Sequence, residues 1–127
     1  MRVILLVGVG SFFGGVFRYG FSTWVHKLLD NPWFPYGTLA VNALGCLVIG
    51  FLAGLAEARS ALTPEARLFL FVGVLGGFTT FSSFALETFS LARDTESLAA
   101  LVNIGLQLVL GLLAVWLGNI LAHALGG

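Results

Sequence analysis

The chain has 127 residues, of which 58% are hydrophobic and only 9% are charged. Soluble domains contain about 25% charged residues, and a core of this size could not hide the remaining apolar surface, so the composition indicates a membrane protein. The net charge is +0, which leaves no basic surface for nucleic acid. The single cysteine, Cys46, excludes an intrachain disulfide and a multi-thiolate metal site, and its apolar neighbours predict a buried, unreactive thiol.

Four segments are long enough to cross the hydrocarbon core of a bilayer, which takes about 20 mostly apolar residues. They predict an all-α membrane protein with one four-helix transmembrane domain over residues 1–127, and spans at roughly 3–27, 36–56, 67–92 and 97–123. The first apolar run is longer than a secretory signal and no Ala-x-Ala site follows it, so we expect a span there. The protein is therefore expected to be a multi-pass protein of the plasma or inner membrane.

Polar connections separate these segments and contain all three prolines. Residues 30–35, Asp-Asn-Pro-Trp-Phe-Pro, predict a turn with interfacial aromatic side chains. In the second connection we expect Thr63 to cap a helix that has Pro64 as its first residue. Residues 93–96 predict a short final turn.

The charges of the connections give little preference for one orientation in the membrane. Lys and Arg in short loops normally set the orientation, but here Arg2, Arg59 and Arg67 on one side oppose Lys27 and Arg93 on the other. Two interpretations stay open. Either both orientations are inserted, or a small bias is enough to select one.

Four helices of this length enclose a poor pore by themselves, so we expect the chain to oligomerise. Gly10-x-x-x-Gly14 and Gly50-x-x-x-Gly54 have the spacing that lets two helices approach closely. The same spacing serves ordinary packing within one chain, so the glycines leave open which interface they form.

The stretch from residue 73 to residue 84 is the strongest candidate for a site. Gly76-Gly77 in the middle of a span predicts a broken helix, and backbone at that depth departs from helix only where protein or a water-filled cavity covers it. The freed carbonyls could bind a cation. Phe81 and Phe84 share one helix face, where their positive ring edges could contact an anion. Hydroxyl donors that could replace lost water belong to Thr79, Thr80, Ser82 and Ser83. The alternative is a packing notch with core aromatics.

Isolated polar residues inside the spans allow two interpretations each. Arg18 either snorkels to the interface or lines an aqueous vestibule, where it would concentrate anions. Asn42 either donates to an anion or bonds to another helix. Asn103 and Gln107 lie four residues apart on one face, which lines a pathway or bonds to another helix. Glu87 is expected to be structural or peripheral.

No set of side chains resembles a catalytic site, so the chain is not expected to be an enzyme. Three motifs instead carry a resemblance to a known family. They read Gly-Gly-Val-Phe-Arg-Tyr at 14–19, Gly-Thr-Leu-Ala-Val-Asn-Ala-Leu-Gly at 37–45, and Gly-Gly-Phe-Thr-Thr-Phe-Ser-Ser-Phe at 76–84. In motif order, length and four-span layout, the chain resembles the Fluc (CrcB) fluoride channels from end to end.

The resemblance implies a passive channel that exports cytoplasmic fluoride down its electrochemical gradient. It implies an antiparallel homodimer with two pores, a broken third helix and a structural sodium ion at the dimer interface. It places the backbone carbonyls of Gly76 and Thr79 on the sodium ion, and Phe81 and Phe84 in the pores. The further pathway residues that it implies are Asn42, Ser82, Ser83 and Arg18. To these we add Thr80 for its hydroxyl and Asn103 for its place on the polar face of the fourth span.

Two positions depart from the common pattern of the family. Asn103 stands where many members carry Tyr, and Ser83 stands where Thr is more common, but neither change removes a donor. Two other functions are alternatives to a fluoride channel. A small four-helix multidrug-type transporter would need a carboxylate in the first helix, which has Arg18 and no Asp or Glu. A membrane scaffold without transport is the other alternative.

Overall fold

The structure is a computed structural model that describes residues 1–30 and 32–126, and this part of the chain is helical without any strand. Its elements are α1 (Arg2–Leu28), α2 (Tyr36–Arg59), α3 (Pro64–Arg67), the π-helix η1 (Leu68–Leu75), α4 (Gly76–Phe78), α5 (Phe81–Arg93) and α6 (Ser97–Gly126). Elements α3 to α5 form one span, Pro64–Arg93, so four helical segments are long and apolar enough to cross a membrane. The predicted all-α fold with four spans is confirmed. Asn31, in the first predicted turn, lies outside the described residues.

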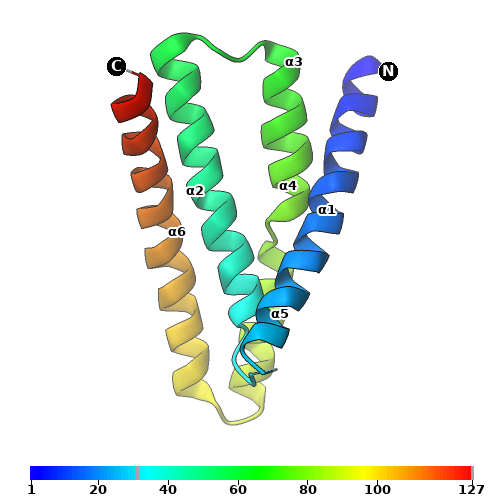
Figure 1. Cartoon of the computed structure of the whole chain (residues 1–127). Coiled ribbons are helices and arrows are strands. Elements are labelled where there is room, and N and C mark those ends of the chain that lie inside the picture. Colours follow the sequence, from blue (N-terminus) through cyan, green and yellow to red (C-terminus); the bar gives the residue numbers. More distant parts are fainter. Residues whose placement is uncertain (31, 127) are drawn as a thin grey trace.

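The four spans form two packed pairs, which are joined where α1 contacts α2 and where α5 contacts α6 (Figure 1). Helix α6 packs along α2, and α1 packs against η1 and α4. The two ends of the chain and the α2–α3 connection lie at one end of the molecule, and the α1–α2 and α5–α6 connections lie at the other (Figure 1). The structure therefore separates the basic residues of the connections as the sequence predicts.

The helix ends follow local sequence signals. Thr63 Oγ1 accepts a hydrogen bond from the Ala66 N–H at 3.2 Å, and Pro64 is the first helical residue, as predicted. This cap begins the third span three residues before the predicted start. Helix α2 continues to Arg59 and ends at Ser60, which adopts the left-handed conformation with φ 48°.

Glycines let α1 approach the third span closely. A Cβ placed on Gly10 would lie 2.7 Å from the Phe69 carbonyl oxygen, and one on Gly14 would overlap the Val74 carbonyl oxygen. Real side chains cannot make such contacts with backbone, so alanine at either position would push the helices apart.

Glycines also let α2 and α6 approach each other closely. A Cβ on Gly50 would overlap the Val115 carbonyl oxygen, and one on Gly118 would overlap the Leu47 carbonyl oxygen. The glycine spacings noted in the sequence thus pack helices within one chain.

Large apolar side chains face outward along all four spans. In each apolar window that could cross the membrane, only 11% to 28% of the residues are buried inside the chain. An apolar surface of this extent suits lipid or a second protein rather than water. The single chain therefore has little core of its own, and its surroundings must cover the remainder.

Candidate functional site

The third span leaves helical geometry at Thr79 and Thr80, which we call the interruption. Thr79 has φ −78° and ψ 157°, and Thr80 has φ −149° and ψ 114°, so both are extended. Gly76 keeps helical angles of φ −63° and ψ −35°. The third span is thus broken in its middle, as predicted, but the break begins at Thr79, the last residue of the predicted 76–79 stretch, and not at Gly76-Gly77. Gly77 serves close packing instead, because a Cβ there would lie 2.6 Å from the Ser11 carbonyl oxygen of α1.

Two consecutive threonines end one helix and begin the next. The Thr79 N–H and Oγ1 both donate to the Leu75 carbonyl oxygen, at 3.0 and 2.9 Å. Thr80 Oγ1 accepts from the Ser83 N–H at 3.2 Å and so caps α5, while its hydroxyl donates to Ser83 Oγ at 3.0 Å. Threonine is a favoured N-cap because its oxygen satisfies a backbone N–H at the helix start.

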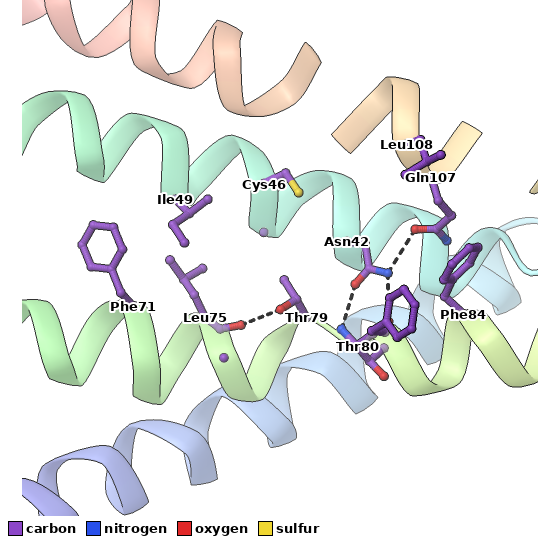
Figure 2. Close-up of a pocket in the computed structure, with 13 residues that line it drawn as sticks. Asn42, Cys46, Ile49, Phe71, Leu75, Thr79, Thr80, Phe84, Gln107 and Leu108 are labelled. Carbon is purple, nitrogen blue, oxygen red and sulfur yellow. Dashed lines mark hydrogen bonds between the residues drawn. The ribbon is translucent and has the colours of Figure 1, made fainter. Parts of the chain in front are cut away.

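Asn42 of α2 holds the interruption from the side. Its Oδ1 accepts from the Thr80 N–H at 2.8 Å, and its Nδ2 donates to the Thr80 carbonyl oxygen and to Gln107 Oε1, each at 3.0 Å. Figure 2 shows these bonds converging from α2, the third span and α6. An amide has two N–H groups, and both are engaged here. The structure thus contains the helix-to-helix bonds that were one of the two alternatives for Asn42 and Gln107.

A cavity of about 450 Å³ opens beside the interruption, and we call it the aromatic cavity. Phe71, Phe81 and Phe84 contribute the rings that line it. The rings of Phe81 and Phe84 meet edge to face with centroids 5.5 Å apart, and Phe81 is 79% exposed. The polar or backbone groups of its lining come from Asn42, Gly76, Thr79, Thr80 and Gln107. Cys46 also lines it and is partly exposed, so the expected burial of its thiol is wrong.

A second cavity, of about 360 Å³, lies between α1, α2 and α5, and we call it the polar cavity. Arg18, Thr80 and Ser83 line it together with Thr38 and Glu87. Thr38 Oγ1 donates to the Glu87 carboxylate at 2.7 Å. Of the two roles expected for Glu87, structural or peripheral, this bond between α5 and α2 fits the structural one. The sequence does contain a signal for the place of Glu87 in this cavity. Thr80, Ser83 and Glu87 are spaced three and four residues apart, so they share one helix face.

The remaining predicted site residues are placed differently. Thr80 is only 7% exposed and lines both cavities, so it forms the wall between them. Ser82 Oγ lies 3.4 Å from Thr80 Oγ1 but lines neither cavity. Asn103 is fully buried, and its Nδ2 donates to Thr88 Oγ1 at 2.9 Å. The sequence could not choose between a pathway and a helix contact for Asn103, and the structure has it bonded to α5.

Three buried polar atoms have no hydrogen-bond partner within the described residues. They are Glu87 Oε2, Asn103 Oδ1 and Gln107 Nε2. Buried polar groups are otherwise almost always paired, with protein or with ordered water. Two of the three belong to residues that line the cavities, which are therefore suited to hold water or an ion.

Comparison with known proteins places the chain in a family. The family model described as "CrcB-like protein, Camphor Resistance (CrcB)" matches residues 5–119. The chain belongs to the CrcB family. As a CrcB protein with four apolar spans, it is a multi-pass integral membrane protein. The resemblance found in the sequence motifs is confirmed.

Curated relatives of this CrcB chain match it over nearly its whole length. The "Fluoride-specific ion channel FluC" of Chlorobium chlorochromatii is 44% identical over 124 residues, which cover 98% of this chain and 95% of the relative. The protein of the same name from Parabacteroides distasonis is 46% identical over 121 residues, or 95% and 92% of the two chains. "Fluoride-specific ion channel FluC 3" of Methanosarcina barkeri is 36% identical over 132 residues, or 100% and 98%.

Proposed function

We propose that this chain forms a fluoride-specific ion channel that lets cytoplasmic fluoride leave down its electrochemical gradient. The observation that carries the proposal is the agreement among relatives that are named fluoride-specific ion channels and match over nearly the full length of both chains. The ring edges, hydroxyls and Arg18 cation that line the two cavities fit this activity, and among the described residues the Glu87 carboxylate is the one group of the polar cavity lining that opposes an anion. Neither catalysis nor a nucleotide is part of the proposal, since the gradient alone drives the ion.

The pathway runs past the interruption, where the two cavities share Thr80 as a wall. In the aromatic cavity, the positive ring edges of Phe81 and Phe84 would face the anion. In the polar cavity, the Ser83 and Thr80 hydroxyls replace water, and the Arg18 cation raises the local concentration of anions. Several weak contacts of this kind suit conduction better than one deep site.

The amide donor that faces the ion is Gln107 in this proposal. Both N–H groups of Asn42 are bonded to protein, to Thr80 and to Gln107. Gln107 Nε2 is a buried donor without a partner in the described chain, and Gln107 lines the aromatic cavity. Asn42 lines the same cavity and would contact fluoride only by giving up one of its bonds. Ser82 and Asn103 remain predicted pathway residues that line neither cavity of a single chain.

We propose an antiparallel homodimer as the working assembly. Phe81 is 79% exposed in a single chain, and the aromatic cavity beside it is open. A second copy would cover this ring and close the cavity, and the nearly even basic residues of the two ends permit opposite orientations.

The carbonyls of the interruption fit a structural sodium ion at this interface. In a continuous helix the Thr80 N–H would donate to the Gly76 carbonyl, but here it donates to Asn42. The Gly76 carbonyl is thereby released, and Gly76 and Thr79 line the same cavity. Carbonyls of unwound membrane helices are known ligands of Na⁺. Two copies would double the number of ligands, and the bound ion would supply positive charge where both chains meet.

The two alternatives receive no support from a specific observation. Helix α1 contains Arg18 and no carboxylate, whereas a multidrug-type transporter of this size would need one. A scaffold without transport disagrees with the names of the relatives, which are fluoride-specific ion channels.

Fluoride efflux from proteoliposomes tests the proposal directly. The full chain is reconstituted, a potassium gradient with valinomycin drives anion exit, and a fluoride electrode records the release. We expect fast fluoride release and no chloride release above that of protein-free liposomes. Monodisperse, correctly inserted protein that releases no fluoride would overturn the proposal, and equal fluoride and chloride release would overturn its specificity.

A further inference from the structure

We infer that Gly45 of α2 is a positioning residue that holds Thr79, and with it the interruption, in the geometry that conducts. The inference rests on the proposed channel function and adds a residue of the aromatic cavity wall that offers no side chain to an ion. Gly45 is buried on α2 and faces the interruption.

The side chain of Thr79 occupies the space that a larger residue at position 45 would need. A Cβ placed on Gly45 would overlap the Thr79 methyl carbon Cγ2 and would lie 3.4 Å from Phe78 Cδ1. Thr79 therefore sits against the bare backbone of α2. No other residue type leaves this space free.

Thr79 cannot easily turn its methyl group away. Its hydroxyl donates to the Leu75 carbonyl oxygen at 2.9 Å, which fixes χ1. Because the three substituents of Cβ have fixed relative directions, a fixed hydroxyl also fixes the methyl group. A β-branched side chain has few other rotamers. A methyl group at position 45 would thus force Thr79 to break its bond to Leu75, or α2 to move outward.

Either response disturbs the candidate site. Asn42 lies three residues before Gly45, on the same face of α2. An outward shift of α2 would stretch the bonds of 2.8 and 3.0 Å between Asn42 and the Thr80 backbone. A rotation at Thr79 would move a residue that lines the aromatic cavity. Gly45 lines the aromatic cavity with backbone alone, and it therefore acts on the site through Thr79 and Asn42.

A rescue experiment tests this role. Overpacking disfavours the packed geometry, and a conducting state disfavoured by about 1.4 kcal/mol is populated about tenfold less, so Gly45→Ala is expected to lower fluoride efflux about tenfold. The double variant Gly45→Ala with Thr79→Ser removes Cγ2 and keeps the hydroxyl, so its efflux should return to that of Thr79→Ser alone. Gly20→Ala is the matched control, because nothing lies within 4 Å of a Cβ at this helical position. Its efflux should equal that of the unchanged protein.

Hydrogen exchange gives a second readout that does not depend on conduction. The Thr80 amide, bonded to Asn42, should exchange faster in Gly45→Ala and slow again in the double variant. Unchanged efflux and exchange in Gly45→Ala would overturn the inference, and so would a loss that Thr79→Ser does not rescue. If Gly45→Ala fails to fold, the double variant must recover folded protein, or the inference fails. Absence of fluoride efflux from the unchanged protein would overturn the proposed function. The hydrogen-exchange pattern would still show whether the contact between Gly45 and Thr79 positions the Thr80 backbone.

Discussion

Asn42→Ala is expected to destabilise the protein far more than the loss of one side-chain contact would. The substitution removes three hydrogen bonds at once, two to the Thr80 backbone and one to Gln107. Alanine offers no replacement, so the Thr80 N–H and carbonyl lose their tie to α2. The interruption would then be held only by its own threonine side chains.

The size of the effect follows from these bonds. Hydrogen bonds between membrane helices contribute about 0.6 kcal/mol each on average, which gives about 2 kcal/mol for three. Leaving a buried backbone group unpaired costs about 1–3 kcal/mol, and Thr80 would have two such groups. We therefore expect Asn42→Ala to lower the free energy of unfolding by about 2–6 kcal/mol.

Reversible unfolding of the full chain in detergent, at one fixed protein concentration, measures this loss. Gln107→Met is the matched variant, because it keeps the side-chain volume and removes only one of the three bonds. Gln107→Met should lower the free energy of unfolding by about a third of the roughly 2 kcal/mol estimated for the three bonds. The double variant Asn42→Ala with Gln107→Met should give a coupling energy of about 0.6 kcal/mol. If Asn42→Ala proves no more destabilising than Gln107→Met, Asn42 does not hold the interruption.

Three further predictions concern the pore, the helix packing and the proposed cation. Phe81→Ile should reduce fluoride efflux about tenfold, since a branched aliphatic side chain has no positive ring edge. Unchanged efflux would show that this ring does not face the ion. Gly50→Ala should lower the melting temperature through a loss of about 1–3 kcal/mol, whereas Gly105→Ala, with nothing within 4 Å of its Cβ, should not. Equal melting of both would refute the close approach of α2 and α6. Exchange of sodium for N-methylglucamine should lower the melting temperature of the dimer. An equal melting temperature in the two salts would count against the cation site.

The spans and their ends could be predicted because they depend on local properties. Apolar length defined the four segments, and Thr63 with Pro64 defined the start of the third. These signals lie within a few residues of the structure that they determine. The family could likewise be recognised, because its motifs are contiguous.

The exact position of the interruption could not be predicted, because a distant side chain determines it. Gly76 and Gly77 have low helix propensity, yet both are helical, and Gly77 packs closely against Ser11 of α1. Thr80 is extended because Asn42, 38 residues away in sequence, pairs with both of its backbone groups. The sequence indicated that Asn42 needs partners, but only the packing of three helices identifies them.

The structural role of Glu87 could be predicted, but its partner and its place in the polar cavity could not. Its position near the end of a span suggested the membrane interface, although it shares a helix face with Thr80 and Ser83. Its bond to Thr38 of α2 draws it inward. The homodimer and its sodium ion involve a second chain, so they stay predictions.

The interruption also has an electrostatic consequence. Within two residues, one helix presents its carbonyl end and the next presents its N–H end, and each end carries about half a unit charge of opposite sign. The chain can therefore offer a negative and a positive pole side by side, at a depth where an ionised side chain would cost at least a few kcal/mol. Residues 73–84 contain no charged side chain. Both poles thus come from two backbone conformations, so a substitution that made Thr79 and Thr80 helical would remove both at once.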